Sequence, residues 1–119
     1  MHGLPKGFDP TRFVGLEVEL VSFAAYSFYL NFDRAAILTV HSSFVHQMPG
    51  DAEPEEASGH PVTESKLMQL SGKTIVSAET DDESTLILTF SNAHRLYVFD
   101  DQPMYECYTM KFGDEEIFV

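Results

Sequence analysis

The chain has 119 residues, enough for one domain whose core needs neither disulfides nor metal. Its 19 acidic residues against 7 lysines and arginines give a net charge of -12, a surface that repels phosphate and so argues against direct binding to nucleic acid or an anionic membrane. A hydrophobic fraction of 44%, with 13% aromatic residues, excludes a disordered chain.

The first half of the chain predicts one short helical turn followed by three strands. Residues 9–15 form the turn, because an aspartate, a proline and a glycine stand where a cap, a first helical position and a stop belong. Apolar and polar residues then alternate with the period of two that is typical of strands half-buried in a sheet. The predicted strands are residues 17–23, 26–32 and 36–40.

Residues 47–62 are rich in proline, glycine and acid and have no periodicity, so they predict a mobile surface loop. Residues 63–72 predict a second short helix capped by Thr63. Strands follow, and the most regular part is a hairpin over Ser84–Val98.

The two halves resemble each other in sequence. Gly15–Val18 matches a segment 57 residues later, and Phe28–Phe32 and Leu38–Val40 match segments 58 residues later. We interpret this as an internal duplication, approximately residues 9–40 and 66–98, in which each copy is a helix turn plus a three-stranded antiparallel meander. Residues 105–119 lie outside the repeat and predict a C-terminal hairpin.

These elements predict a single domain over residues 1–119 that is mainly β, or β-rich α+β. The expected architecture is a sandwich or a partly open barrel. The single cysteine, Cys107, cannot form an internal disulfide, and the N-terminal residues lack the apolar core of a signal peptide. No apolar run approaches the ~20 residues of a spanning helix, so we expect a cytoplasmic protein.

Short motifs in the second half carry a family resemblance. They are Leu70-x-Gly72, Leu86-x-Leu88-x-Phe90-Ser91-Asn92, Asp100-Asp101, Tyr105-Glu106-x-Tyr108 and Ile117-x-Val119. With them, most of residues 12–119 resembles a family of small uncharacterised bacterial proteins known as a domain of unknown function. Members often have glycine at the hairpin turn where this chain has Ala93. The resemblance implies no assigned activity, and only analogy links such proteins to immunity proteins that neutralise toxins.

The sequence contains no recognisable catalytic or metal-binding arrangement. Cys107 lies inside a strand without a positive neighbour, which favours a core thiol. Glu17 and Glu19 share a strand face and could serve acid–base chemistry, but the same pair protects a sheet edge from aggregation. The histidines lack ligand spacing and are expected on the surface or in turns: His2, His41, His46, His60 and His94. We therefore expect no enzyme, no metal and no cofactor.

Two features predict a surface for a partner. Clusters of acidic residues fall at turns and form a negative patch for a basic partner if they lie at one end of the fold. Aromatic residues in the non-core phase of their strands would mark a dimer or partner interface if exposed. The residues are Asp81, Asp82, Glu83, Asp100 and Asp101 in the first set and Tyr29, Tyr97 and Phe99 in the second.

The leading hypothesis is a non-enzymatic acidic module that recognises another protein, in one version an immunity-type inhibitor of a basic toxin. The alternative is a small-ligand-binding β-domain. Its apolar cavity would be lined by Phe28, Phe32, Leu88 and Phe90.

Overall fold

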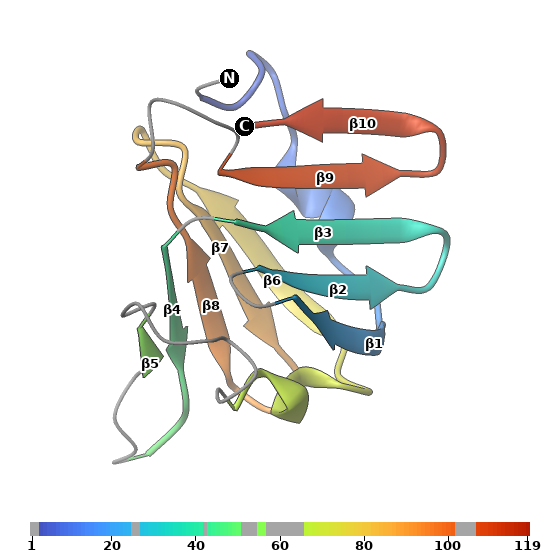
Figure 1. The fold of residues 1–119 in the computed structure, drawn as a ribbon, viewed down its shortest axis with the longest axis vertical. Helices are drawn as coiled ribbons and strands as arrows, with labels where there is room; N and C mark the ends of the chain where they lie inside the picture. The colour runs from blue at the N-terminus through green and yellow to red at the C-terminus, as the bar shows by residue number, and fades with distance from the viewer. Residues whose placement is uncertain (1–2, 25–26, 42, 51–54, 57–65, 102–106) are drawn as a thin grey trace.

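Ten strands and two short helices make up the fold in a computed structural model that describes residues 3–24, 27–41, 43–50, 55–56, 66–101 and 107–119 (Figure 1). In chain order the elements are η1 (Pro10–Phe13), β1 (Val18–Phe23), β2 (Phe28–Phe32), β3 (Ala36–Val40), β4 (Phe44–Gln47), β5 (Glu55–Glu56), η3 (Leu67–Leu70), β6 (Ile75–Thr80), β7 (Leu86–Phe90), β8 (Arg95–Val98), β9 (Tyr108–Phe112) and β10 (Glu115–Phe118).

The strands form two five-stranded antiparallel sheets that pack face to face without closing into a barrel (Figure 1). The first sheet has the order β1-β2-β3-β9-β10 and the second has the order β5-β4-β8-β7-β6. The chain is therefore mainly β, as the sequence predicted. Each sheet combines one predicted meander with a pair of strands from the other half of the chain. In the first sheet β9 pairs with β3, and in the second sheet β4 pairs with β8.

The C-terminal hairpin was expected to have no counterpart in the first half. The structure places β9 and β10 beside β3 in the same way that β4 and β5 lie beside β8. The correspondence escapes sequence comparison because it lies in strand order and pairing, and not in matching residues. Within the predicted loop 47–62, Gln47 belongs to β4, Met48 is buried and Glu55–Glu56 pairs with β4.

The core lies between the sheets and follows from the alternation in each strand. In β2, β3 and β7 every second residue is buried and the residues between are half-exposed. The Phe28 and Phe44 rings, one from each sheet, meet edge to face with centroids 5.0 Å apart, and Phe13 from η1 packs edge to face on Phe32. Burial of these side chains between the layers is the main stabilising term of such a sandwich.

Both helices are single 3-10 turns. The Asp9 side chain accepts a hydrogen bond from the Thr11 N–H (3.0 Å) at the start of η1, as a capping aspartate does. The second helix is shorter than the predicted 63–72 segment and is preceded by Lys66, which makes no side-chain cap because lysine carries no acceptor. Thr63, the predicted cap, lies outside the described residues.

The edges of the two sheets meet where β1 and β6 begin. The Gly15 N–H donates to the Ile75 carbonyl (2.8 Å), and the Gly72 N–H donates to the Val18 carbonyl (2.7 Å). Main-chain hydrogen bonds therefore join the two sheets along this edge, in addition to the packing of their faces.

Equivalent positions on either side of this joint make equivalent bonds. The Asp33 N–H donates to the Glu17 carbonyl (3.0 Å), and the Asp33 side chain accepts from the Glu17 N–H (2.9 Å). The Ser91 N–H donates to the Thr74 carbonyl (2.8 Å), and the Ser91 hydroxyl accepts from the Thr74 N–H (3.2 Å). Each turn thus fastens the start of its own sheet's edge strand.

The hairpin turns before β3 and β8 contain alanines in the left-handed backbone region. Ala93 has φ 69° and Ala35 has φ 57°. This region costs a non-glycine residue about 1–2 kcal/mol. The Ala93→Gly variant should therefore raise the free energy of unfolding by up to about 1.6 kcal/mol, after the loss of about 0.4–1 kcal/mol for greater freedom of the unfolded chain.

Urea unfolding monitored by circular dichroism measures the effect. Ala36→Gly, in the buried part of β3, is the matched control and should lower stability, because glycine weakens a strand interior. A loss of stability in Ala93→Gly would contradict the strain assigned to this turn.

Candidate functional site

The acidic turn between β6 and β7 has a fixed shape. The Asp81 carboxylate accepts hydrogen bonds from the N–H groups of Glu83 (2.9 Å) and Thr85 (3.0 Å). Ser84 follows in the left-handed region with φ 61°. The Asp81 carboxylate thus holds the turn in shape, and Asp82 and Glu83 in the same turn are exposed to solvent.

A second acidic stretch follows β8 and meets the same neighbours. The Asp100 carboxylate accepts from the Gly3 N–H (2.7 Å), while the Ser84 hydroxyl accepts from the N–H of Leu4 (3.0 Å), the next residue. The N-terminal segment thus bridges the β6–β7 turn and the end of β8. Both lie at the same end of the second sheet in Figure 1.

Cys107 and Tyr108, at the start of β9, complete this arrangement. The Cys107 thiol donates to the Asp100 carboxylate (3.2 Å), and the Tyr108 hydroxyl donates to the Ser84 carbonyl (2.7 Å). Both side chains are fully buried, so the core thiol that the sequence predicted is confirmed for Cys107. Burial, followed by the charges of Asp100, Cys107 and Asp81, raises the pKa of Tyr108 far above its usual value, so its hydroxyl stays protonated.

Five carboxylates therefore gather at one end of the fold, and we call this surface the acidic end. Among the described residues, none of the five takes part in a salt bridge. The third acidic cluster of the sequence, around the β9–β10 turn, lies away from them in Figure 1. The acidic end consists of Asp81, Asp82, Glu83, Asp100 and Asp101.

The aromatic residues predicted for a partner surface do not form one patch. Tyr29 lies on the outer face of the first sheet, between Ser22 and Thr39 on its neighbouring strands. Tyr97 lies on the outer face of the second sheet, so the two faces point in opposite directions. Residues of the same strand phase therefore lie on two opposite faces, and their role in binding a partner stays a prediction.

Tyr97 and Phe99 are both half-buried. The Arg95 guanidinium lies over the Tyr97 ring at 5.3 Å, and the Tyr97 hydroxyl donates to the Gln47 side chain (3.4 Å). The Phe99 N–H donates to the Ser43 carbonyl (3.1 Å), which joins the end of β8 to the start of β4. Tyr97 and Phe99 are therefore held by contacts within the chain.

Two histidines are buried together: His94 lies in a turn, as predicted, but is not on the surface, and His46 lies in a strand. His46 on β4 is 0% exposed and His94, just before β8, is 7% exposed. The Nε2 atom of His46 lies 2.8 Å from the Nδ1 atom of His94. Burial, and then the charge of Lys73, lowers the pKa of His94. His41 is exposed as predicted, and His2 and His60 lie outside the described residues.

The sequence held one usable signal for this pair. Phe44, His46 and Met48 alternate as a buried strand phase does, and the structure buries all three. The partner of His46 stands 48 residues away and comes close only because β4 crosses to the second sheet. Among the described residues, no group of three or more histidine, cysteine or acidic side chains is placed to hold a metal ion.

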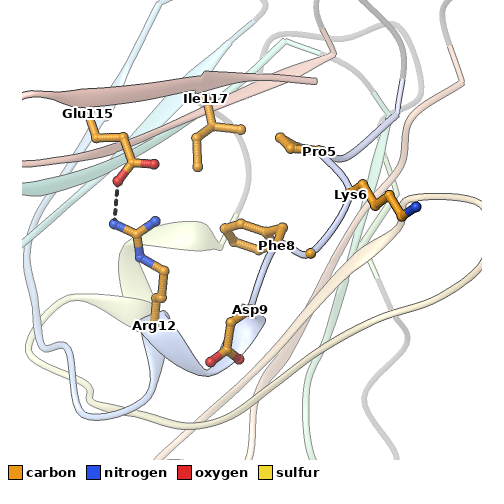
Figure 2. Close-up of a pocket in the computed structure, with 8 residues that line it drawn as sticks. Pro5, Lys6, Phe8, Asp9, Arg12, Glu115 and Ile117 are labelled. Atoms are coloured by element: carbon orange, nitrogen blue, oxygen red, sulfur yellow. Dashed lines mark hydrogen bonds and ion pairs between the residues drawn. The ribbon is translucent and has the colours of Figure 1, made fainter.

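A shallow pocket of about 270 Å³ lies between the N-terminal segment, η1 and β10 (Figure 2). Pro5, Phe8 and Ile117 form its apolar wall. The Arg12 guanidinium bonds the Glu115 carboxylate at 2.8 Å, and this hydrogen bond and charge lower the pKa of Glu115. The Arg12 guanidinium also lies over the Phe112 ring of β9, 4.1 Å from the ring centroid.

This pocket is distinct from the apolar cavity predicted from sequence. The four residues expected to line that cavity are at most 3% exposed and belong to the packed core. The side chains named for the cavity are Phe28, Phe32, Leu88 and Phe90.

Glu17 and Glu19, the two carboxylates considered for acid–base chemistry, are both exposed at the β1 edge.

Comparison with known proteins places the chain in a family but not in a function class. Residues 10–119 match a family of unknown function (DUF6188). The chain belongs to this family. No curated protein and no solved structure matches it. Within the described part of the chain, the helices are too short to cross a membrane.

Tyr108→Phe should lower the free energy of unfolding by about 1–2 kcal/mol, because the part-buried Ser84 carbonyl loses its donor. The raised pKa of Tyr108 also predicts a sign for alkaline pH. The unfolded chain releases this proton near pH ~10 while the folded chain keeps it, so stability present below pH ~10 is lost above it.

Denaturant unfolding between neutral pH and pH ~11 tests both effects. Tyr29→Phe, on an outer sheet face, is the control and should change stability little. The Tyr108→Phe variant should lose less stability than the wild type as the pH rises. An equal loss would contradict the role given to this hydroxyl.

Proposed function

We propose that this protein is an acidic binding module that recognises another, basic protein through the acidic end. The observation that carries the proposal is the convergence of the β6–β7 turn and the end of β8 on the same N-terminal segment. The two acidic stretches, which flank the β7–β8 hairpin in the sequence, thereby form one surface. These carboxylates are part of a net charge of -12, and their gathering at one end would steer a basic partner toward it.

Charge favours a partner of a different kind over a second copy of the chain. An isologous contact through the acidic end would place like carboxylates against each other, which costs free energy unless cations intervene. A basic toxin held by an immunity-type inhibitor has the required complementary charge. The chain has one cysteine, so no disulfide forms within it, and the buried Cys107 thiol that donates to the carboxylate of Asp100 suits the cytoplasm, where thiols remain reduced.

Binding rather than catalysis suits the way the polar groups at this end are used. Asp81 holds a turn, Asp100 accepts from the N-terminal segment and Ser84 accepts from Leu4. These groups hold the surface in shape, and the exposed Asp82, Glu83 and Asp101 remain to meet a partner. A rigid, pre-organised patch binds without a large ordering cost.

We also infer that the chain arose by internal duplication. Support comes from the sequence matches at 57 and 58 residues, from the equivalent strand orders of the two sheets and from the equivalent turn bonds. The pairing register shifts between Val18 and Leu20 in β1 and between Ile75 and Ser77 in β6, at matching positions. The acidic end then breaks the symmetry of an otherwise paired design.

Removal of exposed charge at the acidic end tests the proposed function. The variant Asp82→Asn/Glu83→Gln/Asp101→Asn leaves the hydrogen bonds of Asp81 and Asp100 intact and removes three carboxylates. Affinity isolation from cell extract at low salt should retain a basic protein on the wild type. The triple variant should bind that protein at least about tenfold more weakly, and binding to the wild type should fall as salt rises.

The matched control removes the same net charge elsewhere. Glu19→Gln/Asp114→Asn/Glu116→Gln changes three exposed carboxylates on β1, the β9–β10 turn and β10. This control should bind like the wild type. Equal weakening in both variants would show that only total charge matters, and failure to retain any basic protein would count against the proposal.

A second candidate is small-molecule binding in the pocket of Figure 2, favoured by its apolar wall beside a guanidinium. A ligand with an aromatic ring and a carboxylate would match this combination. Benzoate and phenylacetate should raise the melting temperature of the wild type but not of Arg12→Gln. An equal shift in both proteins, or no shift in either, would remove this candidate.

A further inference from the structure

The buried histidine pair stands at the opposite end of the second sheet from the acidic end. His46 is the third residue of β4, and His94 closes the turn between β7 and β8. With 2.8 Å between Nε2 of one ring and Nδ1 of the other, a single hydrogen fits on the line that joins them. One ring donates this hydrogen and the other accepts it.

The first sheet fills the equivalent place with aliphatic side chains. His46 faces Leu96 across β4 and β8, as Met110 faces Leu38 across β9 and β3. Ala36 precedes Leu38 by the two residues that separate His94 from Leu96, and both Ala36 and Met110 are buried. An apolar pair is therefore compatible with this core position, whereas a buried polar pair carries a desolvation cost. The histidines have a use other than filling space.

The geometry limits how many protons the folded pair can bind. Two neutral rings hold two hydrogens, and a third can be added while one hydrogen still lies between the facing nitrogens. A fourth would put two N–H groups against each other across 2.8 Å and two positive charges in the core. The unfolded chain has no such limit, because each free imidazole titrates near pH ~6.5.

Among the residues that the structure describes, several charged groups belong to the elements around the pair. Lys73, before β6, disfavours positive charge on His94. Glu55 is the register partner of His46 on β5. Arg95 lies over the outer-face ring of Tyr97. Lys66, before η3, is exposed to solvent, which screens its charge.

The turn that carries His94 also contacts η3. The Asn92 side chain accepts from the His94 N–H (3.3 Å) and donates to the Gln69 carbonyl (3.4 Å). The same turn holds Ala93 in the left-handed region. The histidine pair therefore fastens β4 to a turn that is itself fastened to η3.

We propose that His46 and His94 form a proton-operated latch, which holds the Gln47 end of β4 to the β7–β8 turn at neutral pH and releases this corner in mild acid. The proton that drives the release is the second one added to the two neutral rings, which is the fourth hydrogen of the pair. The unfolded or opened corner can bind this proton, and the closed pair cannot. The sign follows: the open state binds more protons, so stability is fully present above pH ~6.5 and falls as the pH drops below it. The latch is independent of the acidic end.

The test compares the wild type with His46→Gln/His94→Gln, whose amides can still donate and accept but do not titrate in this range. For each excluded proton, the unfolding equilibrium constant of the wild type should rise about eightfold between pH ~7 and pH ~5.5, given an unfolded pKa of about 6.5. The double variant should show a correspondingly smaller rise. His41→Gln removes an exposed histidine and should keep the wild-type pH dependence.

Two further measurements keep the proposal falsifiable if the double variant folds poorly. Hydrogen exchange of the wild type should accelerate in β4 below pH ~6, after correction for intrinsic pH effects, while β9 in the first sheet stays protected. NMR titration should show that the two rings together bind fewer than two protons before the corner opens. Independent titration of both rings near pH ~6.5 in the closed protein, or an unchanged pH dependence in the double variant, would overturn the latch.

Discussion

The joint between the β1 and β6 edges constrains the arrangement of the whole structure. Reciprocal main-chain bonds from Gly15 and Gly72 fix the two edge strands against each other, so the sheets keep one orientation and one spacing. That spacing is filled by side chains such as Phe28 and Phe44, which meet between the layers. Main-chain pairing also removes the exposed ends of two edges that would otherwise invite pairing with another chain.

Charge and burial are separated in space by the same geometry. Strand interiors supply the apolar layer, and the acids are left for turns and ends, where water solvates them. The two acidic stretches meet because β7 and β8 form a hairpin whose open end brings the β6–β7 turn beside the end of β8. The N-terminal segment then bonds to both through Gly3 and Leu4. A binding surface of this kind depends on topology as much as on composition.

Sequence alone predicted the elements better than their assembly. The strands Phe28–Phe32 and Leu86–Phe90 follow from strict alternation, which records the burial of one sheet face. Alternation does not say which sheet a strand joins, so it gives Tyr29 and Tyr97 the same phase without showing that they lie on opposite faces of the fold. The crossing of β4 and β9 is determined by long-range pairing, which leaves no local pattern. The contact of His46 with a residue 48 positions away was hidden for the same reason.

The exchange of terminal hairpins has a consequence for how the chain can be divided. Neither half contains a complete sheet, since each lends two strands to the other. A fragment ending before η3 would therefore expose an unpaired flank of β3 and lack β8, one of the two strands that pair with β4. This fragment and the complementary C-terminal fragment should reassemble when mixed, because each supplies two strands to the other's sheet. In one chain, the flank of β3 stays unpaired until β9 has been synthesised, and until then it can pair with a wrong partner.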